Sequence, residues 1–551
     1  MERVSNVGVV RRWAVLAGAL ALLNAALTFT NLWPTPMVRW KGDLSVELAA
    51  VVLLLALARP RGRVPSQSLL RLGAIVWVIL VIGRYADVTV QGLFGREINL
   101  YWDSRHFGAV GEMLAAVANP WLVMAIVAAV VLVPVALYLP IRWALGHVTA
   151  AMGDAVTRRA LRAMAVVALV LGTIQLPRGE EPFAELPQFA TPVTPTYIRQ
   201  ARTLSRELSG IARRVIPPAP PVASDFSRVQ GADVFLVFLE SYGATSWERP
   251  EYVEGLAHAR ARFMRALELS GREVVSAYAE SPTFGGSSWL AHVSLLSGTE
   301  VRDGDTNMRM MAQTGRTTLL TAFKRHGYRT VALMPGLRTP WPEGQFYGFD
   351  AIYGWRDLEY MGPTFGWWDM TDQYVLAKLD AEEASQASRA PLFVFFPTVS
   401  THAPFLPAPP YQPDWSRMLD RRPYPQDILL EAWGQPPDWL NLGPGYVKAL
   451  AYTYDTLGGY MLWRPERDFV MVVVGDHQPP AVVTGDGASW DVPVHVIASR
   501  PALLEQLTRA HGFREGLEPA GPPVSRIDGL MPILLDAFGD AGGAEATLAA
   551  D

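Results

Sequence analysis

The stretch that decides the fold class is DVFLVFLESYG, at residues 233–243. The run that follows Asp233 is apolar without polar alternation, which is typical of a strand that helices bury on both faces of a parallel sheet. Similar apolar runs, separated by segments long enough to be helices, lie at residues 330–334, 392–396, 469–474 and 492–498. The sequence therefore predicts an α/β domain with a mostly parallel sheet.

Polar residues follow two of these runs directly. Glu240 comes after the first run, and Asp476 and His477 come after the fourth. Because open α/β sheets build their sites at the carboxyl ends of strands, we expect these three side chains to lie close together. Carboxylate oxygens with an imidazole nitrogen suit zinc or manganese, so the pattern predicts a metal site. Each residue taken alone also fits an ordinary loop at the end of a strand.

A candidate nucleophile lies in SPTFGGSSWLAHVSLLSG, at residues 281–298. The two glycines predict a turn, and the apolar spacing after Ser287 and Ser288 predicts a helix. A hydroxyl in the first turn of a helix faces unpaired backbone amides and the positive end of the dipole, which favours an anionic oxygen or a phosphate. Serine is also a preferred N-cap residue, and on this segment alone that structural role is the stronger interpretation.

The composition indicates that part of the chain is embedded in a membrane. Hydrophobic residues make up 50% of the 551 residues and charged residues only 18%, against about a quarter charged in an average soluble chain. A signal peptide is a competing interpretation of the first apolar segment, but the later ones argue against it. We predict five transmembrane helices, at residues 13–32, 44–58, 69–83, 121–139 and 163–176.

Charge and cysteine content exclude several classes of protein. The 48 basic and 52 acidic residues give a net charge of -4, which argues against nucleic-acid binding through phosphate neutralisation. The chain has no cysteine, which excludes a disulfide framework, a thiolate metal site and a cysteine nucleophile. Any metal must therefore be bound by Asp, Glu, His or a hydroxyl oxygen.

Basic residues set the predicted orientation in the membrane. The positive-inside rule places the segments that carry them in the cytoplasm and everything after residue 176 outside. We therefore expect a multi-pass protein of the bacterial inner membrane with its large C-terminal part in the periplasm. The basic residues precede the first span, follow the second and separate the fourth from the fifth, at Arg3, Arg11, Arg12, Arg59, Arg61, Arg63, Arg142, Arg158, Arg159 and Arg162.

Four motifs after the apolar spans resemble, in their order, those of the membrane-anchored sulfatase-like branch of the alkaline phosphatase superfamily. They are LESYG at 239–243, GGSSW at 285–289, STHAPF at 400–405 and VVGDHQPP at 473–480. This branch includes lipoteichoic acid synthases, phosphoglycerol transferases and phosphoethanolamine transferases. The similarity in motif order covers residues 231–541, and it implies a transmembrane bundle followed by an α/β domain of the alkaline phosphatase type.

Carried onto this sequence, the resemblance implies one divalent ion held by Glu240, Ser287, Asp476 and His477, with Ser287 as the nucleophile. Manganese or zinc is the expected metal, and magnesium is an alternative. His402 matches a family histidine that approaches the substrate phosphate. It is therefore expected to bind a phosphoryl oxygen or to protonate the leaving oxygen.

Two departures from related families bear on the substrate. Lipoteichoic acid synthases carry Trp-x-Arg where this chain has Trp341 and, at the arginine position, Glu343. Both residues are expected to contact substrate, and the glutamate would repel a phosphate and attract an amine. Sulfatases need a C/S-x-P-x-R frame, and residues 287–291 lack its proline and arginine, so sulfate ester cleavage is the weaker interpretation.

The resemblance implies a metal-dependent phosphotransferase that moves a phospholipid headgroup through a phospho-serine intermediate. The headgroup is phosphoglycerol or phosphoethanolamine, and the expected acceptor is a periplasmic glycan or lipid. Two alternatives stay open: a sulfatase-like hydrolase of phosphodiesters or sulfate esters, and a catalytically silent relative that binds lipid. No nucleic-acid partner is expected.

We expect four parts along the chain. The linker contains an arginine-rich run at 197–214 that suits anionic headgroups, with a solvated helix as the alternative. Residues 99–118 have the apolar spacing of a helix in the outer membrane interface or of an ordinary connector. An insertion at 403–445, rich in proline and tryptophan, is expected to cover the site and recognise the acceptor. The four parts are a transmembrane domain at 1–177, a juxtamembrane linker at 178–230, a catalytic domain at 231–541 and a tail at 542–551.

Overall fold

The chain forms two compact units. One contains residues 1–92 and 96–211, and the other contains residues 93–95 and 212–551. The expected four-part division stays a prediction, and its tail at 542–551 lies outside the described residues. The structure, a computed structural model, describes residues 6–31, 37–58, 66–94, 97–104, 107–108, 111, 120–176, 186–209, 215–339, 341–366, 369–386, 388–485 and 487–540.

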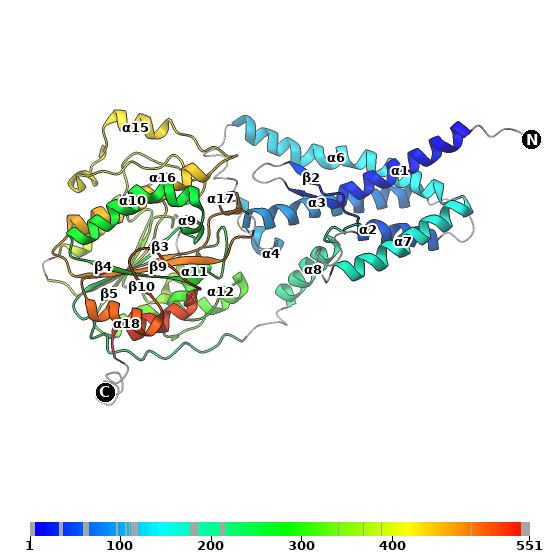
Figure 1. Cartoon of the computed structure of the whole chain (residues 1–551). Coiled ribbons are helices and arrows are strands. Elements are labelled where there is room, and N and C mark those ends of the chain that lie inside the picture. Colours follow the sequence, from blue (N-terminus) through cyan, green and yellow to red (C-terminus); the bar gives the residue numbers. More distant parts are fainter. Residues whose placement is uncertain are drawn as a thin grey trace, which may run out of the picture. The chain divides into compact units, whose positions relative to one another are not determined.

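Long apolar helices build the N-terminal unit (Figure 1). Among the described residues, three helices are long and apolar enough to cross a membrane: α1 (Asn6–Thr28), α3 (Gln67–Phe94) and α6 (Pro120–Ala151). The predicted count of five spans is not confirmed. The helix α2 (Val46–Leu57) has 12 residues, about 18 Å at the usual rise, and α7 (Ala155–Gln175) carries several arginines near its start.

Smaller elements connect these helices. The strands β1 (Phe29–Asn31) and β2 (Val38–Trp40) form an antiparallel pair. Of the predicted interface segment at 99–118, the structure gives a short helix, α4 (Leu100–Asp103), and residues 105–106, 109–110 and 112–119 lie outside the described residues. The arginine-rich run begins with a helix, α8 (Thr194–Ser209).

Helix α8 is fixed at its start by a carboxylate from α2. Glu47 accepts hydrogen bonds from the backbone amides of Val193, at 2.6 Å, and Thr194, at 3.2 Å. A negative charge at this end satisfies unpaired amides and stabilises the helix dipole. Glu47 is an unusual residue for a membrane span, and its charge is thus satisfied by the start of α8 within the same unit.

A mixed sheet forms the centre of the second unit. Its described strands run in the order β10-β4-β9-β8-β3-β7-β5-β6, and β11 pairs with β4. All five apolar runs predicted from the sequence are strands. The bounds are β3 (Asp233–Leu239), β4 (Glu273–Glu280), β5 (Arg329–Met334), β6 (Ala351–Gly354), β7 (Leu392–Pro397), β8 (Phe469–Gly475), β9 (Asp491–Ala498), β10 (Arg514–Glu515) and β11 (Ser525–Arg526).

The expectation of a mostly parallel sheet is not confirmed, because the sheet is mixed. Strands β3, β5, β6, β7 and β8 pair in parallel, but β9 is antiparallel to both β8 and β4, and β10 is antiparallel to β4. The connection from β8 to β9 contains only one short helix, α17 (Ala481–Thr484). Two consecutive strands that pair in parallel need a long crossover connection, usually a helix, whereas a short connection suffices when the second strand runs antiparallel to the first.

Helices cover both faces of this sheet, and they explain why its central strands are continuously apolar (Figure 1). Alternate residues of β3 point to opposite faces: Phe235 and Val237 pack into one core, and Leu236 and Phe238 into the other. The first core includes helices α10 (Pro250–Leu269), α14 (Asp372–Leu379) and α16 (Gly443–Trp463), and the second includes α11 (Trp289–Ser297), α13 (Leu319–Arg325), α18 (Pro501–His511) and α19 (Leu530–Phe538).

Short helices lie in the loops around this sandwich. Within the predicted insertion at 403–445, Trp415 is buried and stacks on Trp463 of α16, whereas Trp433 and Trp439 are partly exposed. The short helices are α9 (Thr245–Glu248), α12 (Gly304–Met311), η3 (Pro342–Tyr347), η4 (Asp380–Ala384), η5 (Trp415–Arg417), α15 (Gln426–Trp433) and η6 (Ile527–Gly529).

Candidate metal and nucleophile site

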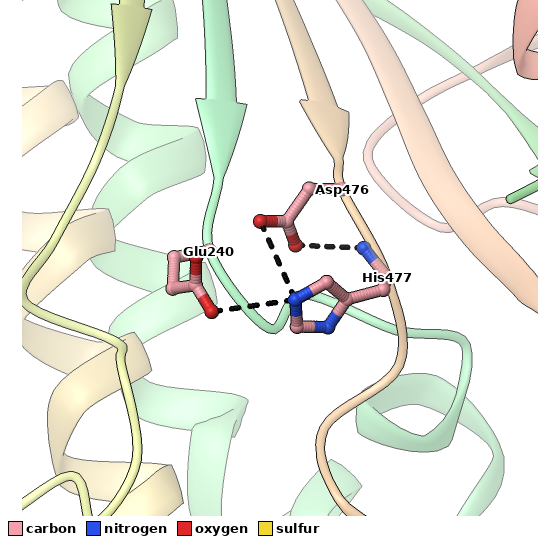
Figure 2. Close-up of side chains that lie close together, drawn as sticks. All are labelled: Glu240, Asp476 and His477. Carbon is pink, nitrogen blue, oxygen red and sulfur yellow. Dashed lines mark hydrogen bonds and ion pairs between the residues drawn. The ribbon is translucent and has the colours of Figure 1, made fainter. Parts of the chain in front are cut away.

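The site lies where two adjacent strands end. Strands β3 and β8 are parallel neighbours, and their last paired residues are Leu239 and Gly475. The next residue on each strand is a carboxylate, Glu240 and Asp476 respectively. Strand pairing therefore sets these two side chains beside each other, although they are far apart in the sequence. The imidazole of His477 joins them (Figure 2).

Three predicted ligands form one compact cluster. The Nε2 atom of His477 lies 3.4 Å from Oε1 of Glu240 and 3.7 Å from Oδ2 of Asp476. One ligand atom from each of the three residues lies within 4.8 Å of the other two. The side chains of His477 and Asp476 are each 1% exposed, and that of Glu240 is 12% exposed. The cluster is therefore buried at its base and reached from the side of Glu240.

Backbone contacts hold the two strand ends at very close range. Ser241 has a positive φ of 57°, and its amide donates a 2.8 Å hydrogen bond to Oδ1 of Asp476. A Cβ atom on Gly475 would lie 1.9 Å from the carbonyl oxygen of Tyr242. Only glycine permits this approach of one backbone to the other.

The hydroxyl that reaches the cluster belongs to Ser288. Its Oγ donates a 2.8 Å hydrogen bond to Oε2 of Glu240 and lies 3.2 Å from Nε2 of His477. The prediction named the neighbouring residue, Ser287, as ligand and nucleophile. Ser287 adopts a positive φ of 64°, which ends the glycine turn, and the helix α11 begins directly after Ser288. Ser288, at the helix start, thus presents its hydroxyl to the carboxylate, and the predicted roles of Ser287 as ligand and nucleophile stay predictions.

The electrostatics of the cluster favour the retention of protons beside one ionised carboxylate. Burial and the nearby Glu240 raise the pKa of Asp476 well above its usual range. Burial opposes ionisation of Glu240 as well, but His477 and then His402 hold its pKa below the usual value. Burial alone would lower the pKa of His477, and the two carboxylates raise it to about 9 instead. The pKa shifts therefore favour an ionised Glu240 beside protons held on Asp476 and His477.

The tautomer of His477 directs a lone pair toward the cluster. Its Nδ1 atom lies 2.7 Å from the carbonyl oxygen of Gln478, which can only accept, so Nδ1 carries a proton. When the ring is neutral, Nε2 is therefore free of hydrogen, and it faces Glu240, Asp476 and Ser288. A histidine held in this way by a backbone carbonyl has the arrangement that metal-binding histidines use.

His402 lies in the loop after β7. Its Nδ1 atom lies 2.7 Å from the carbonyl oxygen of Ala403. The loop is anchored by buried Asp372, which accepts hydrogen bonds from the amides of Val399, at 2.8 Å, and Ser400, at 3.0 Å. Burial raises the pKa of Asp372 to about 6.

The other two predicted contact residues lie on or beside η3. Trp341 precedes this helix and lines a cavity next to α11. The backbone of Glu343 is part of η3, but its side chain lies outside the described residues. Its predicted contact with substrate stays a prediction.

A buried hydrogen-bond chain supports the segment that follows Glu240. The Ser276 hydroxyl donates its hydrogen to the carbonyl oxygen of Gly516 at 2.7 Å. Its contact with Nδ1 of His495, also 2.7 Å long, is therefore one in which Nδ1 carries the proton and the hydroxyl oxygen accepts it. Nε2 of His495 then accepts the hydroxyl proton of Tyr242 at 2.9 Å. Burial lowers the pKa of His495 to about 3, which keeps the ring neutral. The sequence around His495 does not indicate this role, because its partners Tyr242 and Ser276 are distant in the chain.

Part of the chain matches a known family. Residues 294–491 match the family described as Sulfatase. The matched segment contains Asp476, His477 and His402, while Glu240 and Ser288 precede it. None of the curated proteins that were searched matches the chain.

Several solved structures are similar to the chain at low identity. The lipooligosaccharide phosphoethanolamine transferase A of Neisseria meningitidis, an integral membrane protein, is 14% identical with a TM-score of 0.48, and the match covers 96% of this chain and 95% of that one. The lipoteichoic acid synthase LtaP of Listeria monocytogenes is 14% identical with a TM-score of 0.36, over 61% of this chain and 78% of that one.

A third similar structure is the phosphoglycerol transferase GacH of Streptococcus pyogenes in complex with sn-glycerol-1-phosphate. It is 11% identical with a TM-score of 0.33, and the match covers 62% of this chain and 90% of that one. Residues 294–491 of the chain thus match the Sulfatase family, in agreement with the sulfatase-like resemblance of the sequence motifs.

Proposed function

We propose that this protein is a metal-dependent phosphotransferase that moves a phospholipid headgroup to a periplasmic glycan or lipid. One observation carries the proposal. The Ser288 hydroxyl lies 2.8 Å from Glu240 and 3.2 Å from His477, in a cluster that also contains Asp476. A hydroxyl in contact with metal-ligand residues is the arrangement that an activated serine nucleophile requires.

The residues of the cluster fit one divalent cation. Glu240 and Asp476 supply carboxylate oxygens, His477 supplies an imidazole nitrogen and Ser288 supplies a hydroxyl oxygen, a donor set that suits zinc or manganese. The raised pKa values of Asp476 and His477 support the assignment, because a cation that binds such ligands replaces their protons. When bound, the ion would favour the deprotonated hydroxyl and neutralise charge on a substrate phosphate.

Ser288 acts as the nucleophile in the first step. Its oxygen forms a bond to the phosphorus of the donor while its proton passes to Glu240, to which the hydroxyl donates a hydrogen bond. The bond between phosphorus and the diacylglycerol oxygen breaks, and that oxygen leaves with the bonding pair. It takes a proton from His402, which matches the family histidine expected to protonate the leaving oxygen. The headgroup phosphate is then carried on Ser288.

A second displacement completes the transfer. A hydroxyl of the acceptor attacks phosphorus, its oxygen–phosphorus bond forms, and the bond to the Ser288 oxygen breaks. The acceptor proton is taken up by His402, and Glu240 returns its proton to the Ser288 oxygen, which restores the serine hydroxyl. The donor is confined to a bilayer, and three helices among the described residues are long and apolar enough to cross one. Anchoring would therefore raise the effective concentration of donor at the site.

The proposed headgroups are phosphoglycerol and phosphoethanolamine. A transfer assay on the full chain with radiolabelled phospholipid and a cell-envelope glycan fraction tests the proposal. Label on the glycan or on an acceptor lipid supports it. Free phosphoalcohol as the sole product would instead show that the protein is a hydrolase. Absence of turnover together with an unmodified Ser288 would favour the catalytically silent lipid-binding protein.

We also propose that α2 and α7 cross the inner membrane, which gives five crossings and a periplasmic C-terminal unit. The support is the placement of arginines: Arg142 lies near the end of α6, and Arg158, Arg159 and Arg162 lie near the start of α7. Positive charges concentrate in cytoplasmic segments. The connection between α6 and α7 is therefore cytoplasmic in this arrangement.

A further inference from the structure

A cavity of about 760 Å³ opens beside helix α11. Of the described residues that line it, none carries a formal charge. This size and composition are typical of pockets that bind the apolar part of a small molecule. Methionines contribute much of the lining, and their flexible side chains adapt to irregular ligands. The apolar lining includes Trp289, Met308, Met311, Met334, Leu337 and Trp341.

Two polar atoms at the cavity lack partners. Within the described residues, neither Nε2 of His292 nor Oδ1 of Asn307 has a hydrogen-bond partner, and both atoms are buried. The ring of His292 packs against Phe238 and Phe395, with ring centroids 4.5 and 5.4 Å apart. Burial lowers the pKa of His292 to about 3, so its ring is neutral. Buried polar atoms of this kind are costly unless a ligand pairs with them.

The cavity and the nucleophile share one helix. Ser288 immediately precedes α11, Trp289 is its first residue, and His292 follows Ser288 by four positions. Residues four apart on a helix have Cβ atoms about 5–6 Å apart. A substrate whose phosphate contacts Ser288 would therefore have its neighbouring atoms within reach of the cavity.

We propose that this cavity holds the diacylglycerol part of the phospholipid donor, and keeps it as the free alcohol after the first step. This inference rests on the proposed function. An uncharged lining excludes the phosphate, which belongs at the charged cluster, and accepts apolar chains. Diacylglycerol is apolar, and its single hydroxyl donates to Oδ1 of Asn307 or Nε2 of His292. That hydroxyl exists only after the phosphorus–oxygen bond has broken.

Photolabelling of the purified full-length protein tests the site without requiring turnover. The probe is a diacylglycerol with a diazirine in one acyl chain, and labelled peptides are mapped by mass spectrometry. We expect labelling around Asn307 to Ala312 and around Met334, with loss of label when unlabelled dioctanoylglycerol is added. Labelling that lies only in the apolar helices of the N-terminal unit would overturn the assignment. Labelling that a glycan acceptor reduces, but dioctanoylglycerol does not, would also overturn it.

Two variants sharpen the test. Ala312→Phe places a large side chain in the cavity from its wall. The diacylglycerol and the new ring would then compete for the same space, so labelling should fall at least ~10-fold. Asn307→Leu removes the unpaired acceptor without filling space and should lower it by about 5-fold. Ala261→Phe, on the exposed surface of α10, is the matched control and should label normally.

The outcomes separate the two proposals. If Ser288 accepts a headgroup from phospholipid but both cavity variants label like the control, the cavity assignment is wrong and the transferase stands. If both variants lose labelling and Ser288 never accepts a headgroup, the chain has a diacylglycerol site and the proposed transfer is wrong.

Discussion

The Ser288 hydroxyl donates a 2.8 Å hydrogen bond to Glu240, a residue 48 positions earlier in the chain. One partner lies at the start of α11 and the other at the end of β3. Their contact joins the helix that carries the candidate nucleophile to the strand that carries a candidate metal ligand. The adjacent serine, Ser287, provides a matched test of this relationship.

Replacing Ser288 by alanine should reduce headgroup transfer by a factor on the order of 10⁴ or more, since removal of a serine nucleophile eliminates the covalent route. Ser287→Ala should retain activity within about 10-fold, because its hydroxyl is not the one that contacts the cluster. Initial rates of transfer from labelled phospholipid measure both. The reverse ranking, with Ser287→Ala inactive and Ser288→Ala active, would assign the nucleophile to Ser287 instead.

Divalent cations should stabilise the protein through the cluster. A cation at 100 times its dissociation constant adds about 2.7 kcal/mol to the free energy of unfolding, which should raise the melting temperature of chelator-treated protein by about 5 °C. Asp476→Asn should abolish this response to manganese or zinc, whereas Asp427→Asn, on an exposed face of α15, should preserve it. Melting curves and measured metal content provide the readout.

A metal response that is equal in the two aspartate variants would contradict the assigned ligand set. A chelator-treated protein that keeps full transfer activity would contradict metal dependence itself.

The buried His495 should make stability depend on pH. Its pKa is about 3 in the folded chain, against roughly 6.5 when unfolded. The unfolded state therefore binds a proton between these values that the folded state does not. The free energy of unfolding is retained in full above pH 6.5 and falls as pH decreases below it, by about 2 kcal/mol from this group between pH 7 and 5.

His495→Gln should reduce this pH dependence by one proton while lowering stability at pH 7, because the hydrogen bonds with Tyr242 and Ser276 change. Melting temperatures of the full chain at pH 7 and pH 5 measure the difference. An unchanged shift between the two pH values would show that His495 is not held neutral.

The absence of cysteine from the chain allows a direct test of membrane topology. A single cysteine at Ala261, on the second unit, should react with an impermeant maleimide in spheroplasts. One at Ala155, at the start of α7, should react only after the membrane is permeabilised, since five crossings place it in the cytoplasm. If both react in intact spheroplasts, three crossings describe the protein and α7 does not span the membrane.

The sequence predicted those features that depend on short-range pattern. All five apolar runs are strands because helices bury them on both faces. Glu240, Asp476 and His477 meet because they follow strands that pair in parallel, and the rule that sites form at strand ends requires no knowledge of the remaining chain.

Other features of the fold and of the site depend on backbone geometry, which the local sequence pattern does not indicate. The contact between Ser288 and Glu240 follows a turn in which Ser287 has a positive φ and after which α11 begins at Trp289. The direction of β9 follows from a connection without a full crossover helix. The cavity beside α11 combines residues from several distant segments, and no local spacing in the sequence reveals it.

The most direct test of the central claim is mass spectrometry of the peptide that contains Ser288, taken from full-length protein trapped by rapid acid quench with phospholipid donor. We predict that the added mass is phosphoglycerol or phosphoethanolamine and that fragment ions locate it on Ser288. Continued transfer with an unmodified Ser288, or with the headgroup on Ser287, would contradict the account.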